Sequence, residues 1–285
     1  MLTAIRSGLL LEILPNVAAA VLVVAALQTM IGFVATTLDS GERRPWTREK
    51  IAVFARETVL RALFGTLAMI GHRPPAWPVA AGRVPVLLVP DPAWGPASMT
   101  FLARFLAARG LAPQVVVWAR QNRTLSERAT ELDAAIEALR RNAGVSQIDL
   151  VAAGAGGVIA AMGLREIDRA ARVRRMVALA VPFRGTRMAV YRHDDSARDL
   201  RVGALALDAL LPVQAPVVSV WSGDDPEVIP ASSAVADERH AVGIEGCGHL
   251  GLLLSARSFR AVHRALSEPV EAEPRPTSAP SVVLA

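Results

Sequence analysis

The sequence predicts an α/β fold, in which a mostly parallel sheet is covered by helices on both faces. From Val84 onward, short apolar runs alternate with longer segments of helical periodicity, and this alternation is typical of βαβ units. The chain has 285 residues, of which 52% are hydrophobic, enough for one large domain and an additional segment. We therefore expect a single core domain over 84–267.

The order of the expected elements follows from periodicity and from turn residues. Buried strands are expected at 84–90, 113–119, 147–153, 173–182, 215–221 and 240–246. Helices are expected at 98–110, at 124–144 after a Thr or Ser cap, and at 255–267. No internal repeat is present, and the Pro-rich tail 268–285 is expected to be disordered.

Residues 1–45 form the expected membrane anchor. The run Val17–Leu38 is about as long as a bilayer core is thick, and Gln28 is its only strongly polar side chain. A cleavable signal peptide is the alternative, but this run is longer than a typical signal core and ends without a small-x-small site. Within residues 1–14, the segment LLLEIL before Pro15 could form a short helix that lies in the membrane interface.

The basic residues around this run predict its orientation. Only Arg6 and the amino terminus precede it, whereas five basic residues follow: Arg43, Arg44, Arg48, Lys50 and Arg56. Cytoplasmic flanks carry more Lys and Arg than the opposite flanks. We therefore expect a single-pass protein of the bacterial inner membrane with its main domain in the cytoplasm.

The next segment, 46–83, is expected to combine a helix with a linker. Helical periodicity over 46–70 predicts an amphipathic helix that lies on the membrane surface or against the main domain. A second span is the alternative, although the charges Arg56, Glu57 and Arg61 are costly in hydrocarbon. Residues 71–83 are rich in Pro and form a stiff linker.

Composition excludes several kinds of ligand. The net charge is +5 and the pI is near 10.7, but the arginines are scattered and Lys50 is the only lysine, so we expect no nucleic-acid partner. Cys247 is the only cysteine, which excludes an intrachain disulfide and a cysteine-based metal cluster. We expect no cofactor and no metal site.

A strand-to-helix corner is the most informative motif. In IDLVAAGAGGVI, from Ile148 to Ile159, an apolar run passes through small residues directly into another apolar run. This pattern predicts a strand, a tight turn at Gly154 and a helix.

Five segments in the same order resemble bacterial lipases and esterases of the α/β-hydrolase superfamily, over roughly 84–266. The resemblance rests on VPVLLVPDPAWGPASMTFLARFLAARGL, IDLVAAGAGG, LAVPFRGTRMA, SVWSGDDPEVIP and EGCGHLGLL. It implies an α/β-hydrolase fold with a cap over the pocket at about 183–212. In LAVPFRGTRMA, Phe183 stands where the superfamily usually has histidine.

The resemblance also implies roles for individual residues. The corner matches the nucleophile elbow G-x-S-x-G, with Ala152 and Gly156 as the small flanks and Gly154 where the serine belongs. Asp225 and His249 match the catalytic acid and base, and we expect them to form a hydrogen bond. Glycine cannot attack a carbonyl, so the elbow lacks its nucleophile.

The oxyanion loop departs from the superfamily pattern as well. Its positions read Pro90, Asp91 and Pro92, and Pro92 has no N–H to donate. An ionised Asp91 would place negative charge beside a developing anion, which leaves Ala155 N–H as the remaining donor. A one-residue misalignment of this loop is the alternative reading.

Three other residues near these motifs are less favoured for a catalytic role. Asp224 is the alternative acid, Cys247 lies on the histidine loop and not on an elbow, and Ser98 is expected to cap the helix that follows it. The cap residues suit a mobile lid and equally a protein-binding surface.

Three functions remain open at this point. The favoured one is a catalytically degenerate, membrane-anchored α/β-hydrolase that binds a lipid or acyl ligand, or a protein partner. The second is an active esterase or lipase that uses a non-standard nucleophile or a water activated by His249. The third is a purely structural membrane protein whose pocket is filled by side chains.

Overall fold

The computed structural model describes the chain except residues 1, 41–45, 120–122, 193–195, 209 and 269–285. The expected disordered tail from 269 onward, and the two arginines Arg43 and Arg44, therefore lie outside the described residues. Side chains of 2–14 are also not described.

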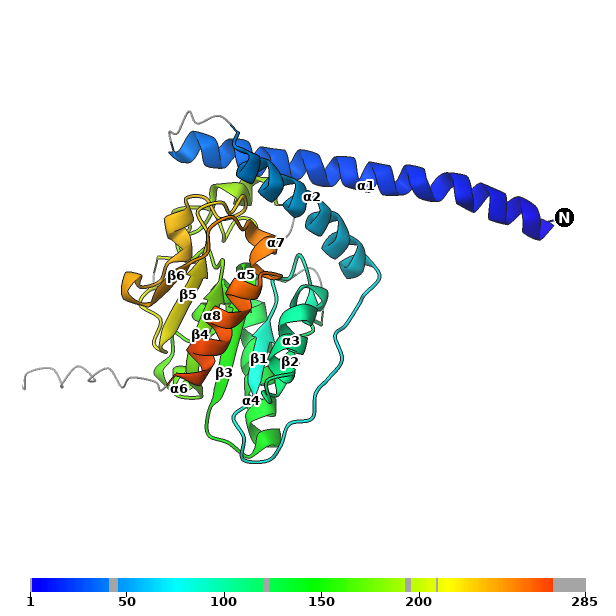
Figure 1. Ribbon diagram of the computed structural model, residues 1–285. Coiled ribbons are helices and arrows are strands. Elements are labelled where there is room, and N and C mark those ends of the chain that lie inside the picture. Colours follow the sequence, from blue (N-terminus) through cyan, green and yellow to red (C-terminus); the bar gives the residue numbers. More distant parts are fainter. Residues whose placement is uncertain (1, 41–45, 120–122, 193–195, 209, 269–285) are drawn as a thin grey trace, which may run out of the picture.

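A six-stranded, fully parallel sheet forms the centre of the domain (Figure 1). The strand order is β2-β1-β3-β4-β5-β6. The strands are β1 (Val86–Val89), β2 (Pro113–Val115), β3 (Ile148–Ala153), β4 (Val173–Leu179), β5 (Val217–Trp221) and β6 (Ala241–Gly243). All six expected strands are thus present, and each is shorter than the sequence indicated.

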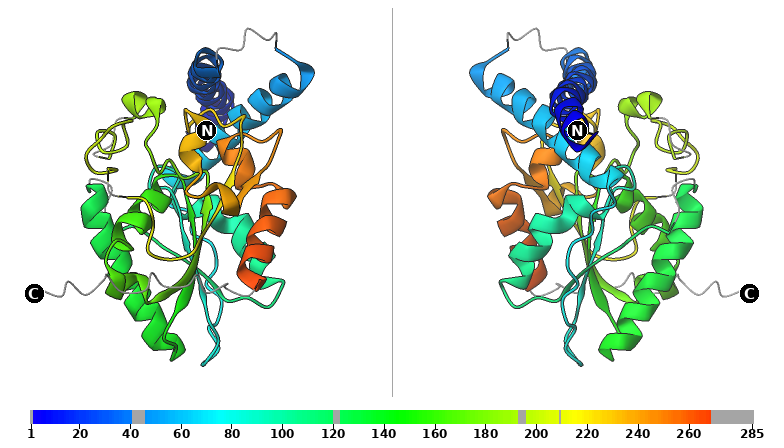
Figure 2. Two further views of the ribbon diagram at one scale, coloured as in Figure 1. Left: turned by 90° about the vertical axis from the view of Figure 1, so that its left-hand side faces the viewer. Right: turned by 90° about the vertical axis from the view of Figure 1, so that its right-hand side faces the viewer.

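Helices cover both faces of this sheet, as Figure 2 shows from two sides. In the domain they are α3 (Thr100–Ala107), α4 (Leu125–Ala143), α5 (Ala155–Gly163), α6 (Ile167–Ala170), α7 (His249–Leu252) and α8 (Ala256–Ser267). Helix α4 begins with a capping box between Thr124 and Glu127 and ends at Gly144 in the left-handed conformation. The expectation for Ser98 was wrong, because its hydroxyl donates to the carbonyl oxygen of Gly95 and caps no helix.

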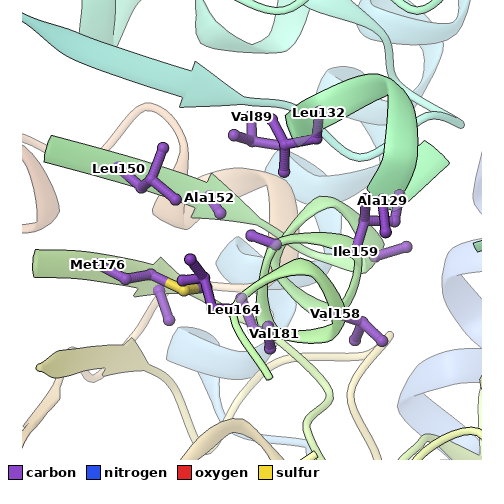
Figure 3. Packing of buried hydrophobic residues seen from close by; sticks show 14 of the residues in the cluster. Val89, Ala129, Leu132, Leu150, Ala152, Val158, Ile159, Leu164, Met176 and Val181 are labelled. Atoms are coloured by element: carbon purple, nitrogen blue, oxygen red, sulfur yellow. The ribbon is translucent and has the colours of Figure 1, made fainter. Parts of the chain in front are cut away.

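The core has two halves because successive strand residues point to opposite faces of the sheet. On one face, Leu150 and Ala152 of β3 pack with Met176 of β4 and with residues of α4 and α5 (Figure 3). On the other face, Val151 and Ala153 pack with residues of α2, α3 and α8. The strands are apolar throughout because both faces are covered.

Two further helices precede the domain. Helix α1 (Leu2–Ser40) contains one stretch, Pro15–Asp39, that is long and apolar enough to cross a membrane. A signal sequence near the N-terminus can also meet this criterion of length and composition. Helix α2 (Arg48–Met69) begins at the Thr47 cap and packs against α1, α7 and the domain core.

The parallel order places the carboxyl ends of all strands at one edge of the sheet, where ligands bind in open α/β sheets. The loops after β1, β3, β5 and β6 meet there. Helix α1 crosses the molecule on this same side (Figure 1). The fold therefore brings the sequence-predicted site residues and the apolar helix together.

Candidate functional site

Gly154 lies at the sharp corner between β3 and α5. Its backbone has φ 53° and ψ −133°, a conformation that side-chain-bearing residues adopt only under strain. A Cβ added here would lie 2.6 Å from Oδ2 of Asp91. The corner thus has the strained geometry of an elbow, and glycine occupies it without strain and without a reactive side chain.

The two glycines after the corner allow close packing. A Cβ on Gly156 would lie 2.5 Å from the carbonyl oxygen of Pro90, and one on Gly157 would lie 2.1 Å from Cγ2 of Val181. Helix α5 can therefore start directly against the loop after β1. This close approach places the Ala155 N–H beside Asp91.

The carboxylate of Asp91 occupies that N–H. Its Oδ2 accepts a hydrogen bond of 2.9 Å from Ala155 N, while Oδ1 accepts one of 2.8 Å from Ala93 N. Asp91 is 2% exposed. A ligand oxygen would have to displace this buried carboxylate in order to reach the Ala155 N–H.

Arg192 from the cap segment balances the charge of Asp91. Its two terminal nitrogens lie 3.3 and 3.4 Å from the Asp91 carboxylate oxygens. Burial raises the pKa of Asp91, but the Arg192 charge and hydrogen bonds from Arg192, Ala155 and Ala93 outweigh it and leave the pKa below its usual value. Asp91 is therefore ionised at neutral pH.

Asp225 and His249 are brought together, as the sequence predicted. Nδ1 of His249 lies 2.9 Å from Oδ2 of Asp225, and both side chains are buried. Oδ1 of Asp225 accepts backbone hydrogen bonds from Glu227 and Val228, which fix the carboxylate. The alternative acid, Asp224, accepts instead from the backbone of Gly246.

A second carboxylate faces the other side of the histidine ring. Oε2 of Glu227 lies 3.7 Å from Nε2 of His249, and Oε1 of Glu227 lies 2.6 Å from Nη2 of Arg61. Burial lowers the pKa of His249, but Asp225 and Glu227 outweigh it and raise the pKa to about 10. Both carboxylates therefore favour the protonated, imidazolium form of the ring, whereas a general base acts in the neutral form.

Glu57 of α2 binds the first turn of α7, the helix that begins at His249. It is fully buried and accepts hydrogen bonds of 2.9 and 2.7 Å from the backbone nitrogens of Leu250 and Gly251. A Cβ on Gly248 would lie 2.3 Å from Cδ of Glu57, so this glycine leaves room for the carboxyl group. Burial raises the pKa of Glu57 to about 7 although the two backbone donors lower it. Helix α2 is therefore part of the site.

A pocket with a volume of about 120 Å³ lies over the corner and opens to the surface. Residues from the corner, the oxyanion loop, the acid loop, the cap and both N-terminal helices line it. They are Gln28, Ile31, Arg61, Asp91, Gly154, Ala155, Pro182, Thr186, Met188, Tyr191, Arg192, Leu200, Glu227, Val228 and His249. Helix α1 thus contributes to the wall of the pocket.

Four of the candidate site residues singled out in the sequence line this pocket: Asp91, Gly154, Ala155 and His249. Pro92 lies beside the pocket in the same loop and is not among its lining residues. Cys247 is buried on the histidine loop, and its carbonyl oxygen accepts from Ser222. Among the described residues, no group of three or more His, Cys, Asp or Glu side chains is placed to hold a metal ion.

Sequence reasoning missed four charged residues of the site: Glu57, Arg61, Arg192 and Glu227. For Glu57 a signal was present, because Gly248 and Gly251 flank His249 and both leave space for its carboxyl group. Arg61 and Arg192 are two among many scattered arginines, so nothing in the sequence marks them.

No family model matches the sequence, and no curated protein matches it. Solved structures do match. Lipase B of Aspergillus fumigatus has a TM-score of 0.56 at 18% identity, over 69% of this chain and 56% of that chain. The mature lipase BlEst2 of Bacillus licheniformis has a TM-score of 0.55 at 13% identity, over 68% and 94%.

The product of the Listeria innocua gene lin2722 has a TM-score of 0.52 at 15% identity, over 67% of this chain and 96% of that chain. This chain therefore spans just over half of the fungal lipase and nearly all of the two bacterial proteins. Likeness at this level of identity shows the fold. The parallel sheet, the covering helices and these neighbours together show that the chain has the α/β-hydrolase fold of lipases and esterases.

Proposed function

We propose that this protein is a membrane-anchored, catalytically degenerate member of the lipase and esterase type, whose pocket binds a lipid or acyl ligand without hydrolysing it. One observation carries the proposal. The Asp91 carboxylate occupies the Ala155 N–H, directly beside the side-chain-free corner at Gly154. The position of the attacking hydroxyl is thus vacant, and the position of the oxyanion is filled.

No other described group of the pocket supplies a suitable nucleophile. The Thr186 hydroxyl donates to the Glu227 carbonyl oxygen and accepts from the backbone nitrogens of Met188 and Ile229. The phenol of Tyr191 belongs to a residue that is 55% exposed, and no base is described beside it. Asp225 and Glu227 favour the protonated form of His249, and this opposes its use as a general base toward either group or a water molecule.

The electrostatics of the site oppose ester hydrolysis directly. The tetrahedral intermediate of acyl transfer carries a negative oxygen, which preorganised N–H donors stabilise. Here the donor at Ala155 already faces an ionised carboxylate. A second negative charge beside Asp91 would be repelled, so this arrangement raises the barrier instead of lowering it.

The pocket walls suit an acyl chain. Ile31, Met188, Leu200 and Val228 supply apolar surface. The charged groups form three ion pairs, which are Asp91–Arg192, Glu227–Arg61 and Asp225–His249. A ligand therefore gains most of its binding free energy from apolar burial. Because α1 forms part of the wall, a molecule can reach the pocket along an apolar helix.

The apolar helix supports anchoring in a membrane, and we propose the inner membrane of a bacterium with the domain in the cytoplasm. Support for the membrane is the length and hydropathy of Pro15–Asp39. Support for the orientation is the basic flank that begins at Arg43 in the sequence.

Lipid analysis tests the binding function. The full chain is extracted in detergent, purified and analysed by mass spectrometry for bound lipid. We expect stoichiometric lipid with the wild type and with Val190→Trp, whose parent residue is exposed and does not line the pocket. Met188→Trp fills the pocket and is expected to lose the lipid. Equal lipid in both tryptophan variants contradicts the proposal, and no lipid in any of them contradicts it too.

A further inference from the structure

We propose that α1 enters the bilayer only with the part that precedes Ala25, and that the part after Ala25 stays docked on the domain, so that the pocket opens at the membrane surface. This inference rests on the membrane anchoring proposed above and refines it. It differs from a span over 17–38, which would place the docked part inside the hydrocarbon.

The second part of α1 is held on the domain by close packing. Ala25, Thr29 and Phe33 are buried at 4%, 0% and 7% exposure. A Cβ on Gly32 would lie 2.4 Å from the carbonyl oxygen of Pro226, next to the acid Asp225. The helix therefore approaches the acid loop as closely as a backbone can.

Polar contacts surround the same part. The hydroxyl of Thr29 accepts a hydrogen bond of 3.3 Å from Nε of Arg61, and Arg61 pairs with Glu227 at 2.6 Å. Further along, Asp39 forms an ion pair with Arg187 of the cap. Charged groups with these partners belong at a water-accessible interface, because burial in hydrocarbon would be costly.

The first part of α1 has the opposite character. From Pro15 to Val24 every residue is exposed, and the run from Val17 onward is apolar on all sides of the helix. A helix that is apolar all round is stable only when it is enclosed by protein or by lipid. In Figure 1 this part extends away from the domain, so lipid is the enclosure that remains.

The length of the first part matches a bilayer core. From Leu2 to Val24 the helix has about 23 residues, or roughly 34 Å at 1.5 Å per residue, against a hydrocarbon thickness of about 30 Å. Twelve of these residues are Leu, Ile or Val. Arg6 and Glu12 are the charged residues of this part, and their cost is offset by the apolar majority.

This placement of α1 would set the route by which a ligand reaches the pocket. Gln28 and Ile31, the two α1 residues of the pocket wall, lie one to two helical turns beyond Val24. The mouth of the pocket is then level with the lipid headgroups. An amphiphile can place its polar end in the bilayer surface while its acyl chain passes along α1 into the pocket.

A depth profile tests this placement. Single cysteines for spin labels are placed at the exposed positions Val17, Val21, Leu27, Val34 and Leu38 in a Cys247→Ala background. The full chain is reconstituted in vesicles of phosphatidylethanolamine and phosphatidylglycerol, and depth is measured from oxygen and nickel-chelate accessibility. A label at exposed Arg257 on α8 is the aqueous reference.

We expect depth to decrease steadily from Val17 to Leu38, with Leu27 in the headgroups and Leu38 as accessible to nickel as the reference. A maximum depth at Leu27, with Val17 and Leu38 equally shallow, overturns the placement while leaving the anchoring intact. Failure of the wild-type chain to float with vesicles overturns the anchoring itself. Uniformly shallow labels, as for a helix lying flat on the membrane, also overturn the placement.

Discussion

The carboxylate of Asp91 and the backbone N–H of Ala155 form a hydrogen bond of 2.9 Å in the interior of the protein. Under the proposed function, this contact puts a fixed negative charge at the position where an oxyanion would be stabilised. It is held by Arg192 on one side and by the glycine corner on the other. We therefore expect Asp91 to have two effects. It leaves no room for a side chain at position 154, and it keeps a substrate oxygen away from the Ala155 N–H.

Gly154→Ser is expected to destabilise the protein by about 1–3 kcal/mol and to produce no esterase activity. The new Cβ would lie 2.6 Å from Oδ2 of Asp91, and the backbone at φ 53° is strained for serine. Urea unfolding measures the first effect and hydrolysis of a p-nitrophenyl ester the second. Esterase activity in this single variant would show that the oxyanion loop is intact, against our description of Asp91 and Pro92.

Asp91→Gly combined with Gly154→Ser is expected to cost less stability than the sum of the two single changes, by about 0.5–3 kcal/mol. Removing the carboxylate makes room for the serine side chain and frees Ala155 N–H. We further expect a fluorophosphonate probe to label the double variant more than Gly154→Ser. Additive stability losses would mean that Asp91 does not restrict position 154.

Gly32→Ala is expected to destabilise the docking of α1 by about 1–3 kcal/mol. Its Cβ would meet Pro226, whereas a Cβ on Gly65 of α2 would meet nothing within 4 Å. Gly65→Ala is the matched control, and we expect it to stabilise the protein by up to about 1 kcal/mol through helix propensity. Thermal unfolding in detergent compares the two. Equal effects would mean that α1 is not held at the acid loop.

Glu57→Ala is expected to cost about 2–4 kcal/mol, because it leaves the N–H groups of Leu250 and Gly251 buried without an acceptor. Glu57→Gln keeps one acceptor oxygen and is expected to cost less. Exposed Glu49 lies on the same helix, and Glu49→Gln should change stability by less than about 0.5 kcal/mol. Unfolding by guanidinium measures all three. An unchanged free energy of unfolding in Glu57→Ala would mean that α2 does not hold the helix that begins at His249.

The pH dependence of stability should report the protonated His249. Its pKa in the folded protein is about 10, above its usual 6.5, so its stabilising contribution is complete below pH 6.5 and is lost as the pH rises through 10. NMR titration of the ring and urea unfolding from pH 6 to 10 measure this. Asp225→Asn is expected to lower the pKa of His249 and to make the loss of folding stability at high pH smaller. A ring that titrates near pH 6.5 would contradict the description of the site.

The main elements were predictable because their signals are local. The apolar strands, the Thr124 cap and Gly144 each depend on residues within a few positions along the chain. The Asp225–His249 pair was predictable through the resemblance, since the fold places both loops at one edge of the sheet. The strands, the helix ends and this pair could therefore be predicted without knowing which distant segments are in contact.

Other parts depend on contacts that no local pattern shows. Glu57 appears in the sequence as a charge that interrupts an apolar run, yet it is fully buried against residues about 190 positions away. The hydrogen bond between Asp91 and Ala155 joins two loops separated by 64 residues. For Ser98 a local pattern was misleading. Serine is common at helix N-caps, but the Ser98 hydroxyl donates to the carbonyl oxygen of Gly95 and does not cap the next helix.

Ester hydrolysis by the purified full chain tests the loss of catalysis most directly. The wild type is compared with His249→Gln and Asp225→Asn under identical purification, so that contaminating esterases contribute equally. We predict the same background rate for all three proteins with short-chain and long-chain acyl esters. A wild-type rate well above the background that disappears in the His249→Gln and Asp225→Asn variants would show an active enzyme and contradict the proposed function.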